Sequence, residues 1–180
     1  MDADMPSDAG YGTQTNPERF TEVVDYAQQL VEQLQEAFVV ERTAGDWAVD
    51  FPRFGDWTDR CPAPVRLTPS KGVPLVLGYT SAPGVVLRVG PNVELMFPDC
   101  LCDGCNYQVV EMCDELQRAV DAATSGGFSE ELTRRSHNWS FDSASGAQRA
   151  SSRKLRRGEW KDLGVRGRFG WKPWEPASAQ

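Results

Sequence analysis

The sequence predicts an α+β fold in which an antiparallel meander sheet carries two main helices packed on one face. Two segments, residues 17 to 40 and 106 to 124, repeat apolar residues at intervals of three and four, which is typical of amphipathic helices. Between them, residues 64 to 97 hold short strand-like runs separated by turn-forming residues. Because connections this short leave no room for crossover helices, the sheet is expected to be antiparallel.

The first helix is predicted from its apolar stripe and its start signals. Thr15 or Asn16 can cap it, Pro17 suits its first turn, and Glu18 and Glu22 lie near its positive end. The stripe consists of Phe20, Val23, Val24, Ala27, Leu30, Val31, Leu34, Ala37 and Phe38. We expect this stripe to be core.

Four runs are predicted to form the meander, and the region before them is predicted as irregular. The runs are residues 64–68, 73–79, 84–89 and 93–97, with Gly and Pro in the turns between them. Residues 47 to 54 are aromatic without a clear period, and residues 55 to 59 read as a loop. Their tryptophans are expected to be packed.

The chain after the second helix is predicted as short strands and a basic end. Gly126 and Gly127 end that helix, and Glu130 to Phe141 alternates as a polar-faced strand with Trp139 and Phe141 on one side. A turn at residues 142 to 146 leads into another short strand, and Arg153 to Arg157 reads as a helical turn.

Length and composition indicate one soluble domain over residues 11 to 176, with flexible ends at 1 to 10 and 177 to 180. The start lacks the basic and apolar regions of a secretory signal, and no run approaches the roughly 20 apolar residues of a membrane span. The odd count of five cysteines suits a reducing compartment. The sequence therefore predicts a cytoplasmic protein with no membrane segment.

The charges divide along the chain. Residues 1 to 130 hold 21 acidic and 8 basic side chains, a net charge of −13, whereas residues 131 to 180 hold 5 acidic and 11 basic ones, a net charge of +6. The basic tail is expected to lie on its own acidic body; the alternative is a basic strip for an anionic partner. Arg166, Arg168 and Phe169 with the nearby tryptophans could contact nucleic acid, but the acidic balance favours packing within the chain.

One chemically distinctive motif follows the last predicted strand, the run Cys100-Leu101-Cys102-Asp103-Gly104-Cys105. Three thiolates within six residues could bind one Zn²⁺, which accepts sulfur ligands in a tetrahedron. The motif lacks a fourth ligand, for which the candidates are Asp99, Asp103, the distant Cys61 and His137, the only histidine. Cys113 lies two helical turns away, about 12 Å from Cys105, too far to share the ion.

Two other interpretations of these cysteines remain open. Cys102 and Cys105 form a C-x-x-C pair at a helix start, where backbone amides lower a thiol pKa and favour redox chemistry. Thioredoxin-like proteins place that motif after a parallel strand, which a meander does not provide. Alternatively, the thiols are small buried apolar groups with Asp103 capping the helix.

No other motif indicates catalysis. His137 has no nucleophile signature beside it, and the chain contains neither a G-x-G-x-x-G fingerprint nor a Walker loop. The leading hypothesis is thus a non-enzymatic domain that binds another protein, with a structural zinc at Cys100, Cys102 and Cys105. The alternative is a thiol- or metal-dependent enzyme using the same cysteines, with Trp57 and Asp59 nearby.

Several segments together resemble an uncharacterised, mainly actinobacterial family catalogued as domain of unknown function 6226. They are Thr15 to Phe20, Val65 to Pro69, Pro83 to Val86, Phe97 to Cys105 and Trp171 to Trp174. The likeness covers residues 11 to 176. It implies a single soluble domain and brings no catalytic residue.

Overall fold

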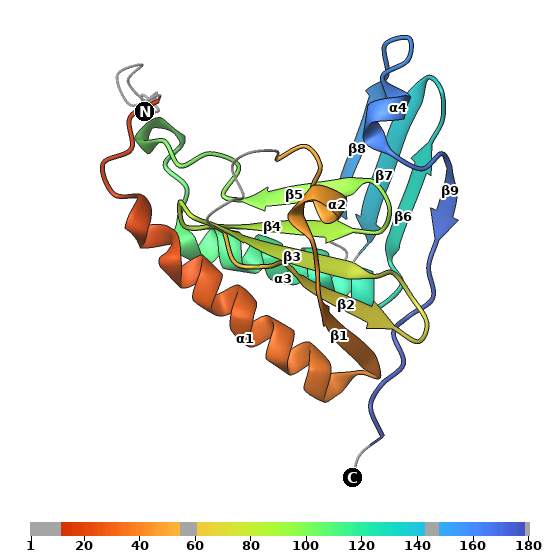
Figure 1. The fold of residues 1–180 in the computed structure, drawn as a ribbon, viewed down its shortest axis with the longest axis horizontal. Helices are drawn as coiled ribbons and strands as arrows, with labels where there is room; N and C mark the ends of the chain where they lie inside the picture. The colour runs from red at the N-terminus through yellow and green to blue at the C-terminus, as the bar shows by residue number, and fades with distance from the viewer. Residues whose placement is uncertain (1–11, 55–60, 143–147, 179–180) are drawn as a thin grey trace, which may run out of the picture.

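The computed structural model describes residues 12–54, 61–142 and 148–178 and contains two antiparallel sheets with helices against them (Figure 1). The predicted α+β class with antiparallel strands is confirmed. No helix in the described part of the chain has the length and apolar character needed to cross a membrane. The predicted flexible ends remain a prediction, because residues 1–10, 179 and 180 lie outside the described residues.

The first sheet is the predicted meander with one additional strand. Its strands follow chain order: β1 (Val40–Ala44), β2 (Val65–Pro69), β3 (Leu75–Thr80), β4 (Gly84–Val89) and β5 (Val93–Phe97). The additional strand is β1, a polar edge strand whose last four residues are exposed. Since edge position and exposure remove the apolar alternation, no hydropathy pattern predicted this strand.

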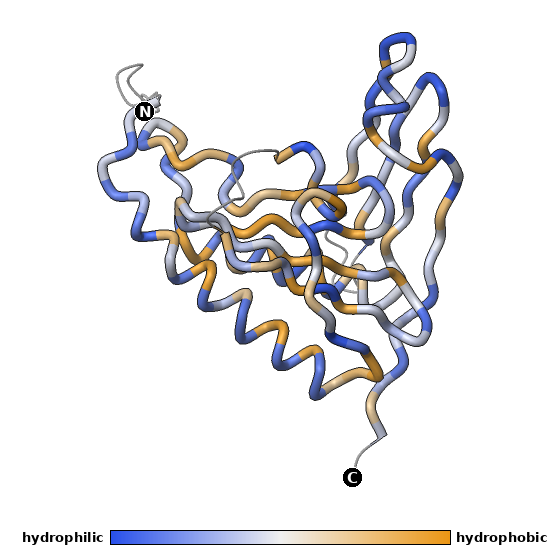
Figure 2. The backbone as a smooth tube through the Cα atoms, viewed as in Figure 1, coloured by the Kyte–Doolittle hydropathy of each residue, from blue (hydrophilic) through white to orange (hydrophobic). Residues whose placement is uncertain are grey.

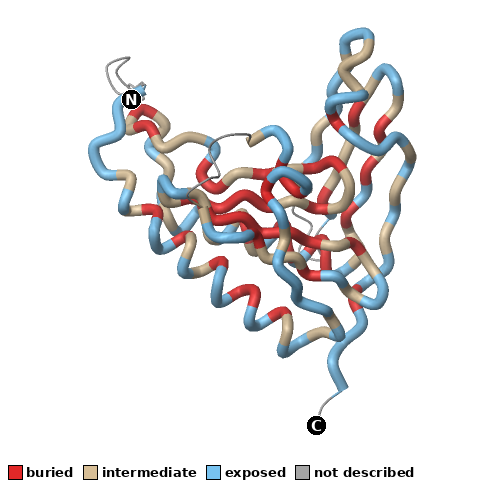
Figure 3. The backbone as a smooth tube through the Cα atoms, viewed as in Figure 1, coloured by how far each residue is buried: buried red, intermediate tan, exposed pale blue. Residues whose placement is uncertain are grey.

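Helices α1 (Thr21–Ala37) and α3 (Val109–Thr124) lie side by side against one face of this sheet. Tyr26 in α1 donates a hydrogen bond of 2.5 Å to the Gln117 side chain in α3. The apolar stripes face inward, as the alternating hydropathy along α1 shows in Figure 2 and the buried strands show in Figure 3. The core includes Phe20, Val23, Leu30, Leu34, Leu67, Leu75, Leu77, Leu87, Phe97, Leu116 and Val120.

Both helices begin later than predicted. Residues Pro17–Phe20 form a 3₁₀ turn, and neither that turn nor α1 has a side-chain cap, so the predicted capping by Thr15 or Asn16 is wrong. The Thr15 N–H instead points to Asp103, in the loop that carries the cysteines. Helix α3 starts at Val109, because the residues after Cys105 turn through Asn106, whose φ of 46° is left-handed.

The opposite face of the meander is covered by the short helix α2 (Trp47–Asp50). Trp47 and Phe51 pack there on Val76 and Val86, so the expected packing of Trp47 is confirmed. Trp57 lies outside the described residues.

A second sheet projects from the body, in the order β8-β7-β6-β9 (Figure 1). It comprises β6 (Phe128–Leu132), β7 (Ser136–Asp142), β8 (Gln148–Lys154) and β9 (Gly167–Gly170), with α4 (Trp160–Leu163) before β9. The single strand predicted over residues 130 to 141 is therefore a hairpin. The helical turn predicted at residues 153 to 157 is wrong, because Arg153 and Lys154 end β8.

The two sheets share one core. The rings of Phe128 and Phe141, which are tilted against each other with centroids 4.9 Å apart, belong to the same apolar cluster as the helices and the meander. Trp174 is also buried there, and its indole N–H donates to the Val73 carbonyl at 3.0 Å. The C-terminal segment therefore ties the second sheet back to the first, and Trp174 covers the core edge as expected.

Candidate metal centre

The three cysteines lie in the loop that joins β5 to α3. Cys102 is buried, with 3% of its surface exposed, while Cys100 and Cys105 are half-buried. Asp103–Cys105 form a single 3₁₀ turn, and the buried Gly104 at its centre has no side chain to separate the thiols. This tight path lets three side chains from one short segment face the same point.

The three sulfurs form a compact group. All lie within 4.8 Å of one another, and the Sγ atoms of Cys102 and Cys105 are 3.1 Å apart. A tetrahedral Zn²⁺ with Zn–S bonds of about 2.3 Å requires sulfurs about 3.8 Å apart, whereas a disulfide requires about 2.05 Å. Cys100, Cys102, Cys105 and Cys113 are free thiols. A small opening of the group would therefore fit an ion, whereas a disulfide needs a closer approach.

The pKa values of two of the three thiols are shifted in opposite directions. Hydrogen bonds from Cys100 and Cys105, together with the backbone N–H of Gly12, lower the pKa of Cys102 to about 7 despite its burial. The hydrogen bond to Cys102, burial and the neighbouring sulfurs raise the pKa of Cys105 to about 12. One thiolate is thus stabilised by its neighbours, and further ionisation requires a compensating positive charge such as a metal ion.

A segment near the N-terminus lies against the cysteine loop. The Asp103 N–H donates to the Thr13 carbonyl at 2.8 Å, and the Thr15 N–H donates to the Asp103 carboxylate at 3.3 and 3.2 Å. Asp103 therefore holds residues 12 to 15 over the thiols and does not cap α3, which has no side-chain cap.

The predicted candidates for a fourth ligand do not join the three sulfurs. Among the residues with described positions, no other His, Cys, Asp or Glu ligand atom lies within 4.8 Å of all three. Cys61 lies beside Leu101 in a small apolar hollow behind the loop, and His137 is buried in the second sheet on Glu130. The exposed Asp99 faces away into a neighbouring pocket. The ligand set remains a prediction for metal analysis to test.

Zinc binding at pH 8 is expected to release at least one proton. The raised pKa keeps Cys105 protonated at that pH, and it must lose its proton to bind as a thiolate. Zinc affinity should also fall as the pH drops below 7, because Cys102 then takes up a proton that competes with the metal. Calorimetric titration in buffers of different ionisation enthalpy measures the proton count; affinity independent of pH would contradict thiolate ligation.

Replacing Asp103 is expected to loosen the N-terminal segment. Asp103→Ala removes the acceptor of the Thr15 N–H, a loss of about 0.5–1.5 kcal/mol, so amides of residues 13 to 15 should exchange faster with solvent. Hydrogen exchange read by mass spectrometry checks this. Asp99→Ala is the matched control, since its exposed carboxylate is outside this contact.

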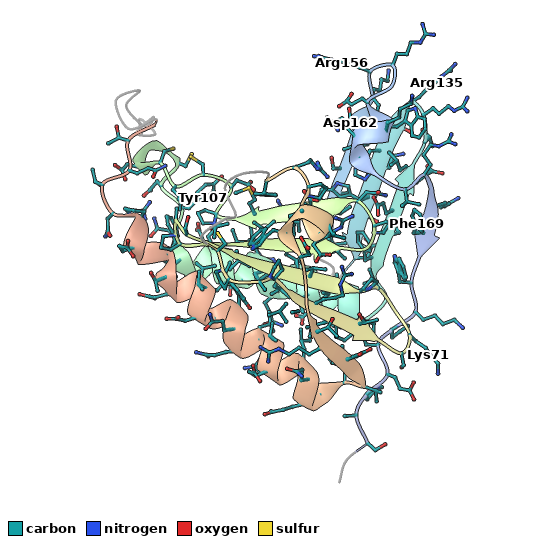
Figure 4. All side chains as sticks on the ribbon, in the orientation of Figure 1. Lys71, Tyr107, Arg135, Arg156, Asp162 and Phe169 are labelled. Atoms are coloured by element: carbon teal, nitrogen blue, oxygen red, sulfur yellow. The ribbon has the colours of Figure 1, made fainter. Side chains whose placement is uncertain are left out.

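A charged pocket of about 420 Å³ lies beside the cysteine loop, between α3 and the second sheet. Its walls carry Asp99, Glu115, Arg118 and Arg149, and Glu115 pairs with Arg149 at 3.3 Å. Burial, followed by the nearby charges of Asp99, Cys105, Cys100 and Glu115, raises the pKa of Tyr107, which lines the same pocket (Figure 4). No sequence motif predicted this group, because its members come from three separate segments: the connection between β5 and α3, helix α3 and strand β8. Trp57 and Asp59, expected near the site, lie outside the described residues.

Among known proteins, the chain matches the model of one protein family, and it matches no curated protein and no solved structure. This model, described as "Family of unknown function (DUF6226)", matches residues 1–178. Because the match covers nearly the whole sequence, the chain belongs to the DUF6226 family.

Proposed function

We propose that this chain is a non-enzymatic protein-binding domain of the cytoplasm, stabilised by a structural zinc ion on Cys100, Cys102 and Cys105. The observation that carries the zinc proposal is the convergence of the three sulfurs within 4.8 Å of one another. The odd count of five cysteines supports a reducing compartment.

A structural role for the ion is favoured by its ligands and its position. Three thiolates would outweigh the charge of Zn²⁺, which weakens its ability to polarise a substrate or acidify a bound water. The centre would also fix the loop that orients α3 and holds residues 12 to 15.

Metal content of the purified protein tests the zinc proposal. The wild-type chain should contain one zinc per molecule by elemental analysis, and Cys102→Ser should contain none. Cys113→Ser is the control, because Cys113 is a half-buried thiol of α3 outside the group of sulfurs. Absence of zinc, with five titratable thiols after purification without chelators, would falsify the proposal.

The protein-binding surface we favour is the outer groove between α1 and α3. Glu22, Asp25 and Tyr26 of α1 face Val109 and Val110 of α3 across it, and Val110 is 65% exposed. An apolar strip edged by carboxylates fits a protein segment that combines apolar and basic residues. Affinity purification from the native cell should recover a partner with the wild type that Glu22→Lys/Asp25→Lys loses; identical recoveries would exclude this groove.

The second candidate is a metal- or thiol-dependent enzyme. The observation that favours it is the charged pocket beside the thiols, where Tyr107, Arg118 and Arg149 could orient an anionic substrate. A catalytic zinc keeps an exchangeable water, so cobalt substitution should give a visible spectrum that changes when small anions are added. A spectrum insensitive to anions would favour the structural role.

A further inference from the structure

The cations of the C-terminal region gather at one end of the second sheet. Strand register places Leu132, Ser136, Lys154 and Gly167 at the same end of the sheet. The two connections between these strand ends, residues 133–135 and 155–166, therefore meet there. These connections and the adjoining strand ends carry eight exposed cations, which we name the basic tip: Arg134, Arg135, Arg153, Lys154, Arg156, Arg157, Lys161 and Arg166. Only two acidic residues, Glu159 and Asp162, lie among them.

Most of these cations have no carboxylate partner. In the described part of the chain, only Arg153 of the basic tip forms an ion pair, at 2.8 Å from Glu159. The Arg156 backbone N–H and the charges of Arg153 and Arg156 lower the pKa of Glu159, as expected in a positive field. The basic tip therefore presents an excess of positive charge to solvent.

The basic tip also stands away from the acidic helices. Arg135 and Arg156 extend from the far end of the projecting sheet, whereas α1 lies along the opposite side of the molecule (Figure 4). The expectation that the tail's charges lie on the acidic body is wrong for the basic tip. Within the described residues, Arg149, toward the other end of β8, is the one cation after residue 130 that pairs with the body, through Glu115.

We propose that the basic tip binds double-stranded nucleic acid through its phosphate backbone, without reading sequence. Six of the eight cations are arginines, whose planar guanidinium groups match phosphate oxygens in pairs. Cations from neighbouring connections at one sheet end can follow a row of phosphates. When such cations bind to nucleic acid, counterions condensed on its phosphates are released, and this release favours binding.

Magnitudes favour nucleic acid over an acidic protein. Non-specific binding to a phosphate backbone reaches a Kd of about 10⁻⁴ to 10⁻⁶ M at physiological salt. Exposed ion pairs between proteins contribute only about 0.2–1 kcal/mol each, and association costs at least about 4 kcal/mol. A protein interface would need apolar anchors, and in this region Val165 is the one large apolar residue among the strongly exposed ones.

The aromatic residues favour a duplex over a single strand. Trp174 is buried, Phe169 stacks on Trp171 with centroids 6.5 Å apart, and Arg166 lies 4.4 Å over the Trp160 ring. These contacts leave the rings less free surface for stacking on unpaired bases. The exposed cations are therefore the main groups available to contact nucleic acid, and they bind its phosphates.

Fluorescence anisotropy with a labelled mixed-sequence DNA duplex tests this proposal on the full chain. Binding should weaken steeply between about 50 and 200 mM salt, and a duplex of different sequence should bind equally well. Arg156→Gln and Arg135→Gln should each weaken binding and reduce the slope of log K against log salt by about 1. Arg42→Gln, which changes an exposed arginine of β1 in the first sheet, is the matched control and should leave both unchanged.

Three results would overturn the proposal: no binding to the duplex at about 50 mM salt, an equal loss with Arg42→Gln, or tighter binding to polyglutamate than to DNA. The last result would identify an acidic protein as the partner. Unchanged melting temperatures of the variants establish that lost binding is not lost folding. None of these outcomes bears on the zinc proposal.

Discussion

Chelation of zinc is expected to lower the melting temperature of the wild-type chain by about 8–16 °C. An ion that binds only the folded state stabilises it by about 4 kcal/mol when free zinc is about 1,000 times its dissociation constant. For a chain of this length, each kcal/mol corresponds to about 2–4 °C. The effect is large for three side chains because the unfolded loop does not bring the sulfurs together, so binding energy becomes folding energy.

The variants separate loss of zinc from loss of packing. Cys102→Ser should melt near the temperature of the chelated wild type and should not respond to chelator, whereas Cys113→Ser should retain the full response. Scanning calorimetry with and without chelator measures both. A wild-type melting temperature that chelator leaves unchanged would leave the three thiols as ordinary free cysteines of a well-packed loop.

The parts of the fold that were predicted from sequence are those whose apolar pattern repeats within one segment. The stripe from Phe20 to Leu34 identified α1, and the short apolar runs identified β2 to β5, because burial of one face imposes a period on the sequence. Strand β1 was missed because it buries almost nothing. Arg153 and Lys154 were misassigned because charge alone does not distinguish an exposed strand end from a helical turn.

The candidate site was predicted only in part, because a sequence motif indicates contacts between residues that are close together in the chain. Cys100, Cys102 and Cys105 are close in sequence, so their convergence could be anticipated from a tight turn at Gly104. The contact between Asp103 and Thr15 joins residues 88 positions apart, and the pair of Glu115 and Arg149 joins residues 34 apart. Such contacts depend on how sheets and helices pack, which no short motif encodes.

His137 shows how a local pattern can be right while its consequence is missed. Alternation places it on the same face of β7 as Trp139 and Phe141, as the sequence predicted for the latter two. Because it is polar and lacks a catalytic signature, the sequence indicated a histidine at the surface or in a strand, and the surface alternative is wrong. That face joins the common core, where His137 Nε2 lies 2.8 Å from Glu130 Oε1 and both side chains are buried.

Removing one member of this pair is expected to be among the most destabilising single substitutions in the chain. His137→Ala should lower the free energy of unfolding by about 3–5 kcal/mol, because it leaves a buried carboxylate without its partner. Glu130 is poorly placed to compensate, since its Oε2 already has no hydrogen-bond partner. Urea unfolding followed by tryptophan fluorescence measures the difference.

Two further variants test whether the cost comes from the unpaired charge. Asn138→Ala changes the neighbouring residue, which is half-exposed and bonds to Ser152 on the other face of β7, and should cost no more than about 1.5 kcal/mol. Glu130→Leu/His137→Leu replaces the whole pair with apolar side chains and should recover most of the stability lost in His137→Ala. If the double variant is as unstable as the single one, the loss comes from packing around the imidazole, and the buried charge is not its cause.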